Sequence, residues 1–127
     1  MDYGYTKETE LSFERAVEKT KEELLREGFG VLTEINIKKA LKEKLQVEYD
    51  NYVILGACNP PFAYEALKAE KEIGLLLPCN VIIFEDKKKV FVSAIRPTVA
   101  MSAARTKSLG EIAQKVEAKL KRVVDGV

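Results

Sequence analysis

Residues 52–61 read YVILGACNPP and change from one secondary-structure pattern to another within a few positions. The run 52–57 is apolar and follows the turn-forming pair Asp50-Asn51, which is typical of a fully buried strand. Asn59 then precedes two prolines. This order is typical of a helix start, because the N–H that proline lacks is not needed in the first turn. We therefore expect a buried strand that passes directly into a helix.

Patterns of the same two kinds continue on both sides of this stretch. Helical spacing of apolar residues follows the cap residues Ser12 and Asn36, and Ser108 with Glu111 has the spacing of a capping box. The expected elements are an edge strand over 3–8, a helix over 13–27, a half-buried strand over 29–37, a short helix after Asn36, the strand over 52–57, a helix from Asn59 to Gly74 with Phe62, Ala63, Ala66 and Leu67 inward, a strand over 75–84 with Pro78 at its start, edge or bulge, a strand over 90–95 after the charged turn 86–89, and a helix from Ser108 to Val123.

The order of these elements predicts an α+β fold. Helices on one face of a mostly antiparallel sheet, in a two-layer sandwich, fit this order better than a doubly wound parallel sheet does. The chain has 127 residues, which is the length of one ordinary domain. We therefore expect a single domain over residues 1–127.

The chain contains no His, and this excludes several kinds of catalytic site. A Ser-His-Asp triad, a Cys-His pair and a zinc site with His ligands all need an imidazole. Two cysteines cannot form a four-cysteine zinc site unless other ligands complete it. The net charge is +1, from 21 Lys and Arg against 20 Asp and Glu, which argues against a nucleic-acid-binding protein.

The remaining composition predicts a location and a thermal class. The start of the chain lacks the features of a secretory signal, and no apolar stretch approaches the ~20 residues that span a bilayer. We therefore expect a cytoplasmic protein without a membrane segment, in which cysteines stay reduced. Sixteen Glu and sixteen Lys against two Gln are typical of proteins from hot environments, so we also expect a thermostable chain.

The two cysteines stand in the two longest stretches without a charged side chain, 51–64 and 73–84, and an Asn follows each of them. Cys58 lies at the expected helix N-terminus, where free N–H groups and the helix dipole favour an anion, including a thiolate. Gly56 has no side chain, which leaves room for a ligand to reach backbone donors. Cys79 lies in an apolar strand. Both cysteines are equally explained as small buried hydrophobes, and this alternative stays open.

Four polar residues near these stretches are further candidates for ligand binding. Asn59 is either a helix cap or a ligand-binding group, and Asn80 in its apolar run needs partners that a pocket or a turn would supply. Arg96 and Arg105 flank the small-residue segment 97–104, which suits a mobile lid, and such a pair suits an anionic ligand. Ordinary surface arginines are the alternative.

The segment 52–60, the Ala-Leu pair of the following helix, and GLLLPCNV over 74–81 resemble the bacterial and archaeal family called domain of unknown function 302. The resemblance extends over nearly the whole chain, including residues 28–32 and 95–97. It implies an α+β fold like that of the TATA-binding protein, often found as a dimer. It does not imply DNA binding, because the fold alone does not determine the function, and the family has no established activity.

Three functional hypotheses follow from these residues. In the first, Cys58, Asn59, Cys79 and Asn80 line a pocket for a small anionic or thiophilic ligand, such as a soft metal ion. In the second, Cys58 is the nucleophile of a redox or sulfur-transfer enzyme and Cys79 is its resolving thiol. In the third, the apolar runs form only the core and interface of a homodimer. Cys58 and Cys79 are the only thiols available to a metal, and the sequence identifies no cofactor.

Overall fold

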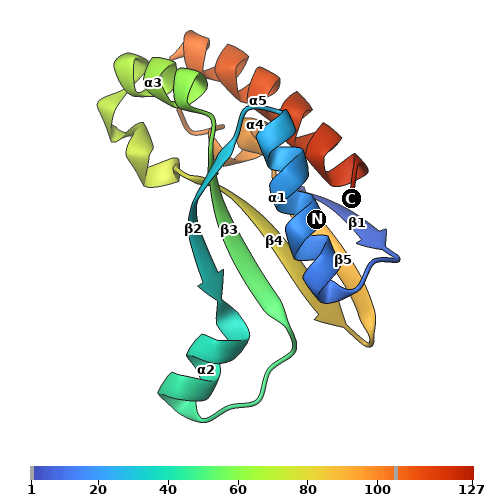
Figure 1. Cartoon of the computed structure of the whole chain (residues 1–127). Helices are drawn as coiled ribbons and strands as arrows, with labels where there is room; N and C mark the ends of the chain where they lie inside the picture. Colours follow the sequence, from blue (N-terminus) through green and yellow to red (C-terminus); the bar gives the residue numbers. More distant parts are fainter. Residues whose placement is uncertain (1, 105) are drawn as a thin grey trace.

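The computed structural model describes residues 2–104 and 106–127. Its centre is a five-stranded sheet with the order β1-β5-β4-β3-β2, in which every neighbouring pair is antiparallel (Figure 1). The elements along the chain are β1 (Gly4–Thr9), α1 (Phe13–Arg26), β2 (Gly30–Asn36), α2 (Ile37–Leu45), β3 (Tyr52–Cys58), α3 (Pro60–Ala69), the 3-10 helix η1 (Lys71–Leu76), β4 (Cys79–Asp86), β5 (Lys89–Ile95), α4 (Pro97–Ala100) and α5 (Lys107–Asp125).

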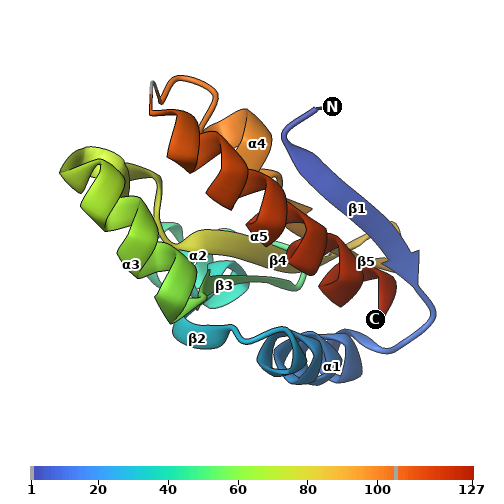
Figure 2. The same ribbon diagram turned by 90° about the horizontal axis from the view of Figure 1, so that it is seen from above.

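Helices α1 and α5 cover one face of this sheet, and α3 lies beside α5 (Figure 2). Alternate residues of the central strands point to the helices and are buried, as the two-residue period of a strand requires. The core includes Val53, Leu55, Val81, Ile83 and Val92 from the sheet, Leu24 from α1, and Leu120 and Val123 from α5. The predicted α+β fold, with a largely antiparallel sheet and helices packed against it, is confirmed.

The local signals that begin the first two helices, and the one that ends the first, are also confirmed. The Ser12 side chain accepts a hydrogen bond from the backbone N–H of Arg15, and Asn36 accepts one from Lys39 in the same way. Gly28 follows α1 with φ +87°, a conformation that glycine adopts without strain. Within the described residues, no helix has the length and apolar character needed to cross a membrane.

Three predicted boundaries are wrong. The helix after Asn59 ends at Ala69 rather than at Gly74, and residues 71–76 form η1. The strand expected over 75–84 begins only at Cys79, because Pro78 has no N–H to donate to the sheet and Leu75 and Leu76 are exposed. Pro78 thus directly precedes the strand. The last helix begins at Lys107, so Ser108 lies inside its first turn instead of capping it.

Strand β2 is much more exposed than the predicted half-buried strand. Phe29, just before it, is buried and Val31 is half-buried, but the residues from Leu32 to Asn36 are exposed. The pairing register with β3 shifts between Val31 and Thr33, as in a β-bulge. The bulge interrupts the alternation that the sequence suggests, and the position of β2 at the sheet edge leaves little to cover it.

The sheet face opposite α1 and α5 is also apolar. Its central strands present Tyr52 and Ile54 from β3, Ile82 and Phe84 from β4, and Phe91 from β5, all half-buried. The Tyr52 and Phe84 rings stack with centroids 5.6 Å apart, and the Phe84 and Phe91 rings stack at 5.2 Å. Three aromatic rings from three neighbouring strands thus form one stacked row on this face.

Candidate functional site

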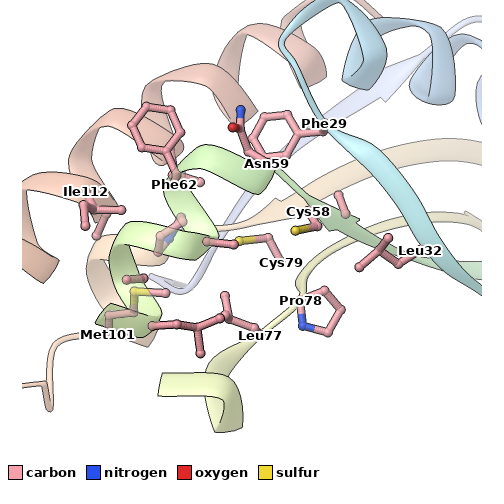
Figure 3. Close-up of a pocket in the computed structure, with 17 residues that line it drawn as sticks. Phe29, Leu32, Cys58, Asn59, Phe62, Leu77, Pro78, Cys79, Met101 and Ile112 are labelled. Carbon is pink, nitrogen blue, oxygen red and sulfur yellow. The ribbon is translucent and has the colours of Figure 1, made fainter. Parts of the chain in front are cut away.

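A cavity of about 290 Å³ opens where β3 passes into α3, next to the start of β4 and to helices α4 and α5 (Figure 3). None of the described residues that line it carries a charge. Most of its lining side chains are aliphatic or aromatic, among them Phe29, Phe62 and Ile112, and Cys58, Asn59 and Cys79 add two thiols and one amide. The cavity is therefore suited to an apolar ligand.

The sheet register brings the two cysteines to this cavity. Ala57 pairs with Cys79 across β3 and β4, so Cys58 lies one position beyond the residue opposite Cys79. Both thiols are free, and both side chains line the same cavity (Figure 3). Cys58 is half-buried, whereas Cys79 is only 8% exposed. Two residues that are 21 positions apart in the sequence thus share one cavity.

The surroundings of Cys79 keep its thiol protonated. Burial, with a smaller contribution from the neighbouring Cys58, raises the pKa of Cys79 to about 11. The thiolate is the form of cysteine that attacks an electrophile or binds a metal ion. At neutral pH, Cys79 therefore behaves as an apolar wall residue, which leaves Cys58 as the accessible thiol of the cavity.

Asn59 is the N-cap residue of α3 by position, but its side chain does not cap the helix. Its Nδ2 donates instead to the carbonyl oxygen of Glu27 at 3.2 Å and joins the start of α3 to the end of α1. The prolines at positions 60 and 61 supply no N–H, so the first turn of α3 has fewer free donors than an ordinary helix start. The expected anion site at this helix end therefore has few N–H donors with which to bind an anion.

The mouth of the cavity is formed by exposed apolar side chains that the sequence did not single out as functional. Leu32 is 67% exposed, and Leu67 of α3 and Pro78 before β4 are the other exposed residues of the described lining. Leu32 lies at the register shift of β2, and a bulge redirects a side chain in this way. Met101 lines the interior, next to α4. Short-range sequence patterns contain no signal for such a bulge.

Three other candidate residues, Gly56, Asn80 and Arg96, do not line this cavity. Gly56 is packed against Thr33 and Pro78, because a Cβ built on it would lie 2.2 Å from Thr33 Oγ1. Asn80 is exposed rather than buried, and it borders two other hollows. Arg96 donates from Nε to Glu117 at 3.2 Å. The candidate Arg105 lies outside the described residues.

The segment 97–104, predicted as a mobile lid, contains the short helix α4 and is tied to α5. Glu117 accepts hydrogen bonds from the backbone N–H of Thr98 at 3.0 Å and from its hydroxyl at 2.6 Å. Within the described part of the chain, no three His, Cys, Asp or Glu residues are grouped so as to hold a metal ion. A metal ion in the cavity would therefore depend on the two thiols.

The family model described as "Domain of unknown function DUF302" matches residues 5–127. This chain belongs to the DUF302 family. The crystal structure of an uncharacterized conserved DUF302 protein from Bacillus stearothermophilus superimposes with a TM-score of 0.92, at 28% sequence identity and over 98% of each chain. The resemblance inferred from the sequence is confirmed, whereas no curated protein matches this DUF302 chain.

Proposed function

We propose that this DUF302 domain is a binding module that holds a small thiophilic ligand, in contact with Cys58, in the cavity at the end of β3. The observation that carries the proposal is that both cysteines of the chain line one cavity of about 290 Å³. Buried cysteines that serve only as core residues need no open space beside them. Here a half-buried thiol borders a space close to the size of ordinary ligand pockets.

The lining favours a thiophilic ligand over an anionic one. An anion needs cations or several N–H donors, but the described lining residues include no Lys or Arg, and two prolines begin α3. A reduced thiol is the group that a soft metal ion or an electrophilic organic molecule prefers. A cytoplasmic location, where cysteines stay reduced, is part of this proposal.

A thiol-specific probe tests this function. Phenylmercuric acetate carries a thiophilic metal on an apolar ring, and we expect it to bind the native protein through Cys58 and raise its melting temperature. A Cys58→Ser variant should lose this effect, whereas the matched Cys79→Ser variant should keep it. Equal binding by the native protein and by Cys58→Ser would show that Cys58 is only a core residue.

The enzyme hypothesis receives less support from the same residues. A resolving thiol must ionise to attack a mixed disulfide, and burial raises the pKa of Cys79 to about 11. Cys79 would therefore respond slowly near neutral pH. Cys58 therefore remains a candidate nucleophile only toward a thiophilic ligand that is bound in the cavity.

A homodimer is a second candidate function, and the sheet face opposite α1 and α5 supports it. The half-buried Tyr52, Phe84 and Phe91 form a stacked aromatic row on that face. An apolar face of this kind is typical of a surface that a second copy covers. In sedimentation experiments we expect Phe84→Asp to shift the protein to a monomer. Tyr64→Asp, which changes an exposed residue of α3, is the control, and equal behaviour of the two folded variants contradicts this interface.

A further inference from the structure

We infer that the cavity takes an uncharged, mainly hydrocarbon molecule that enters between Leu32, Leu67 and Pro78. The inference rests on the proposed function because it concerns the same cavity, but it goes further by assigning the chemical class and the entrance of the ligand. It follows from three independent features, which are the size of the cavity, the absence of charge in its described lining, and the side chains at its mouth.

The size of the cavity sets the size of the ligand. An engineered cavity of about 150 Å³ in another protein binds benzene. The cavity described above has a volume of about 290 Å³, roughly twice as large. A ligand of about twice the size of benzene, such as a chain of roughly eight carbons or a two-ring aromatic molecule, therefore matches it.

The lining sets the charge of the ligand. Moving an ionised group into an apolar space is unfavourable unless an opposite charge or several hydrogen bonds compensate. None of the described lining residues is charged, and Arg96 is already paired with Glu117. The amide Nδ2 of Asn59 is also engaged, by the carbonyl of Glu27. An uncharged ligand thus enters the cavity at little cost in hydration free energy, whereas an ionised ligand of equal length enters at a large cost.

The mouth identifies the route of entry. An isolated exposed leucine is ordinary on a protein surface, and Leu25 of α1, at 73% exposed, is an example. Leu32, Leu67 and Pro78 differ because they come from β2, from α3 and from the residue before β4, and because they are the exposed members of the described lining of one cavity. Leu32 reaches that cavity through the bulge in β2, a device that often lies next to functional sites. Apolar side chains gathered in this way favour an apolar ligand.

Octan-1-ol and octanoate form a matched pair of probes, with the same chain length and a different charge. Isothermal titration would measure both with the native protein, with Leu32→Glu and with Leu25→Glu. We expect octan-1-ol to bind at least about tenfold more tightly than octanoate, and Leu32→Glu to weaken its binding by about tenfold. Leu25→Glu introduces the same change on an exposed leucine outside the cavity and should leave binding unchanged.

The outcomes separate this inference from the proposed function. Equal affinity for both probes, no binding of either, or equal effects of the two leucine variants would overturn the inference. A Cys58→Ser variant should still bind octan-1-ol, because the hydrocarbon contacts do not need the thiol. If octan-1-ol binds as expected while phenylmercuric acetate shows no dependence on Cys58, the thiophilic function fails and the hydrocarbon site stands.

Discussion

Glu117 of α5 is the buried charge on which the wall of the cavity depends. It is 6% exposed, and it accepts hydrogen bonds from the backbone and hydroxyl of Thr98 and from Arg96. Thr98 belongs to α4, and Pro97 of the same helix and Met101 at its end line the cavity. We predict that Glu117→Gln destabilises the fold and loosens α4.

The contacts of Glu117 set the expected magnitude. Removing one partner of a fully buried ion pair costs about 3–5 kcal/mol. The loss should be smaller here, because the Arg96 side chain is 33% exposed and water can solvate it after the change. Gln also keeps an oxygen that can accept from Thr98, though without the charge that strengthens such bonds. We therefore expect a loss of about 2–3 kcal/mol, or roughly 10 °C in melting temperature.

The pH dependence gives this prediction a second readout. Burial alone would raise the pKa of Glu117, but the hydrogen bonds from Thr98 and Arg96 outweigh it and hold the pKa below its ordinary value of 4.5. The stability that the carboxylate contributes is present above the pKa of the unfolded chain. It is lost as the pH falls through the lower pKa of the folded protein. The difference between the native protein and Glu117→Gln should therefore be full near pH 7 and shrink below about pH 4.

Thermal unfolding followed by circular dichroism at both pH values checks this reasoning. Glu111→Gln is the matched control, because Glu111 lies on the same helix and is exposed, and we expect it to change stability by less than about 0.5 kcal/mol. Equal melting temperatures of the two variants at pH 7 would refute this role of Glu117. A stability loss in Glu117→Gln that persists undiminished in acid would also refute it.

Two further predictions concern the residues around the cysteines. Gly56→Ala should cost roughly 2 kcal/mol in urea unfolding, because its Cβ would lie 2.2 Å from Thr33 Oγ1, whereas Gly30→Ala meets nothing within 4 Å and serves as the control. A chromogenic disulfide reagent near pH 8 should titrate Cys58 in the native protein and Cys79 only after denaturation, since burial raises the pKa of Cys79 to about 11. Rapid reaction of both native thiols would contradict this burial.

Elements with a strong local signal could be predicted from the sequence, and elements that depend on their neighbours could not. Ser12 and Gly28 bracket α1 through their own backbone and side-chain chemistry, so the sequence contains the information. The apolar alternation of β2 suggests a buried face, but burial depends on whether another element packs there. At the sheet edge, with a bulge at Leu32, no such cover exists for most of the strand. Likewise, Leu75 and Leu76 in the apolar run before Cys79 are exposed as part of η1.

The candidate site could be predicted only where residues adjacent in the sequence determine it. Cys58 lies at the junction of a strand and a helix because residues 52–61 alone specify that junction. That Cys79 would join it depends on antiparallel pairing of β4 with β3, which the sequence left open. Asn80 was expected to be buried, but successive side chains of a strand point to opposite faces of the sheet. Its neighbour Cys79 faces the cavity, so Asn80 points to the opposite side.

The cavity itself arises from side-chain size rather than from any motif. Where α3 lies beside α5, the lining residues include Ala63 and Ala66 of α3 and Ala113 of α5, and Ala57 of β3 also lines the cavity. Protein interiors are otherwise packed densely, and a larger apolar residue at such a position would bury more surface and stabilise the fold. The alanines therefore give the fold less stability than larger residues would, and they leave an open space. This arrangement is expected of a binding cavity and not of a core whose only role is to hold the fold together.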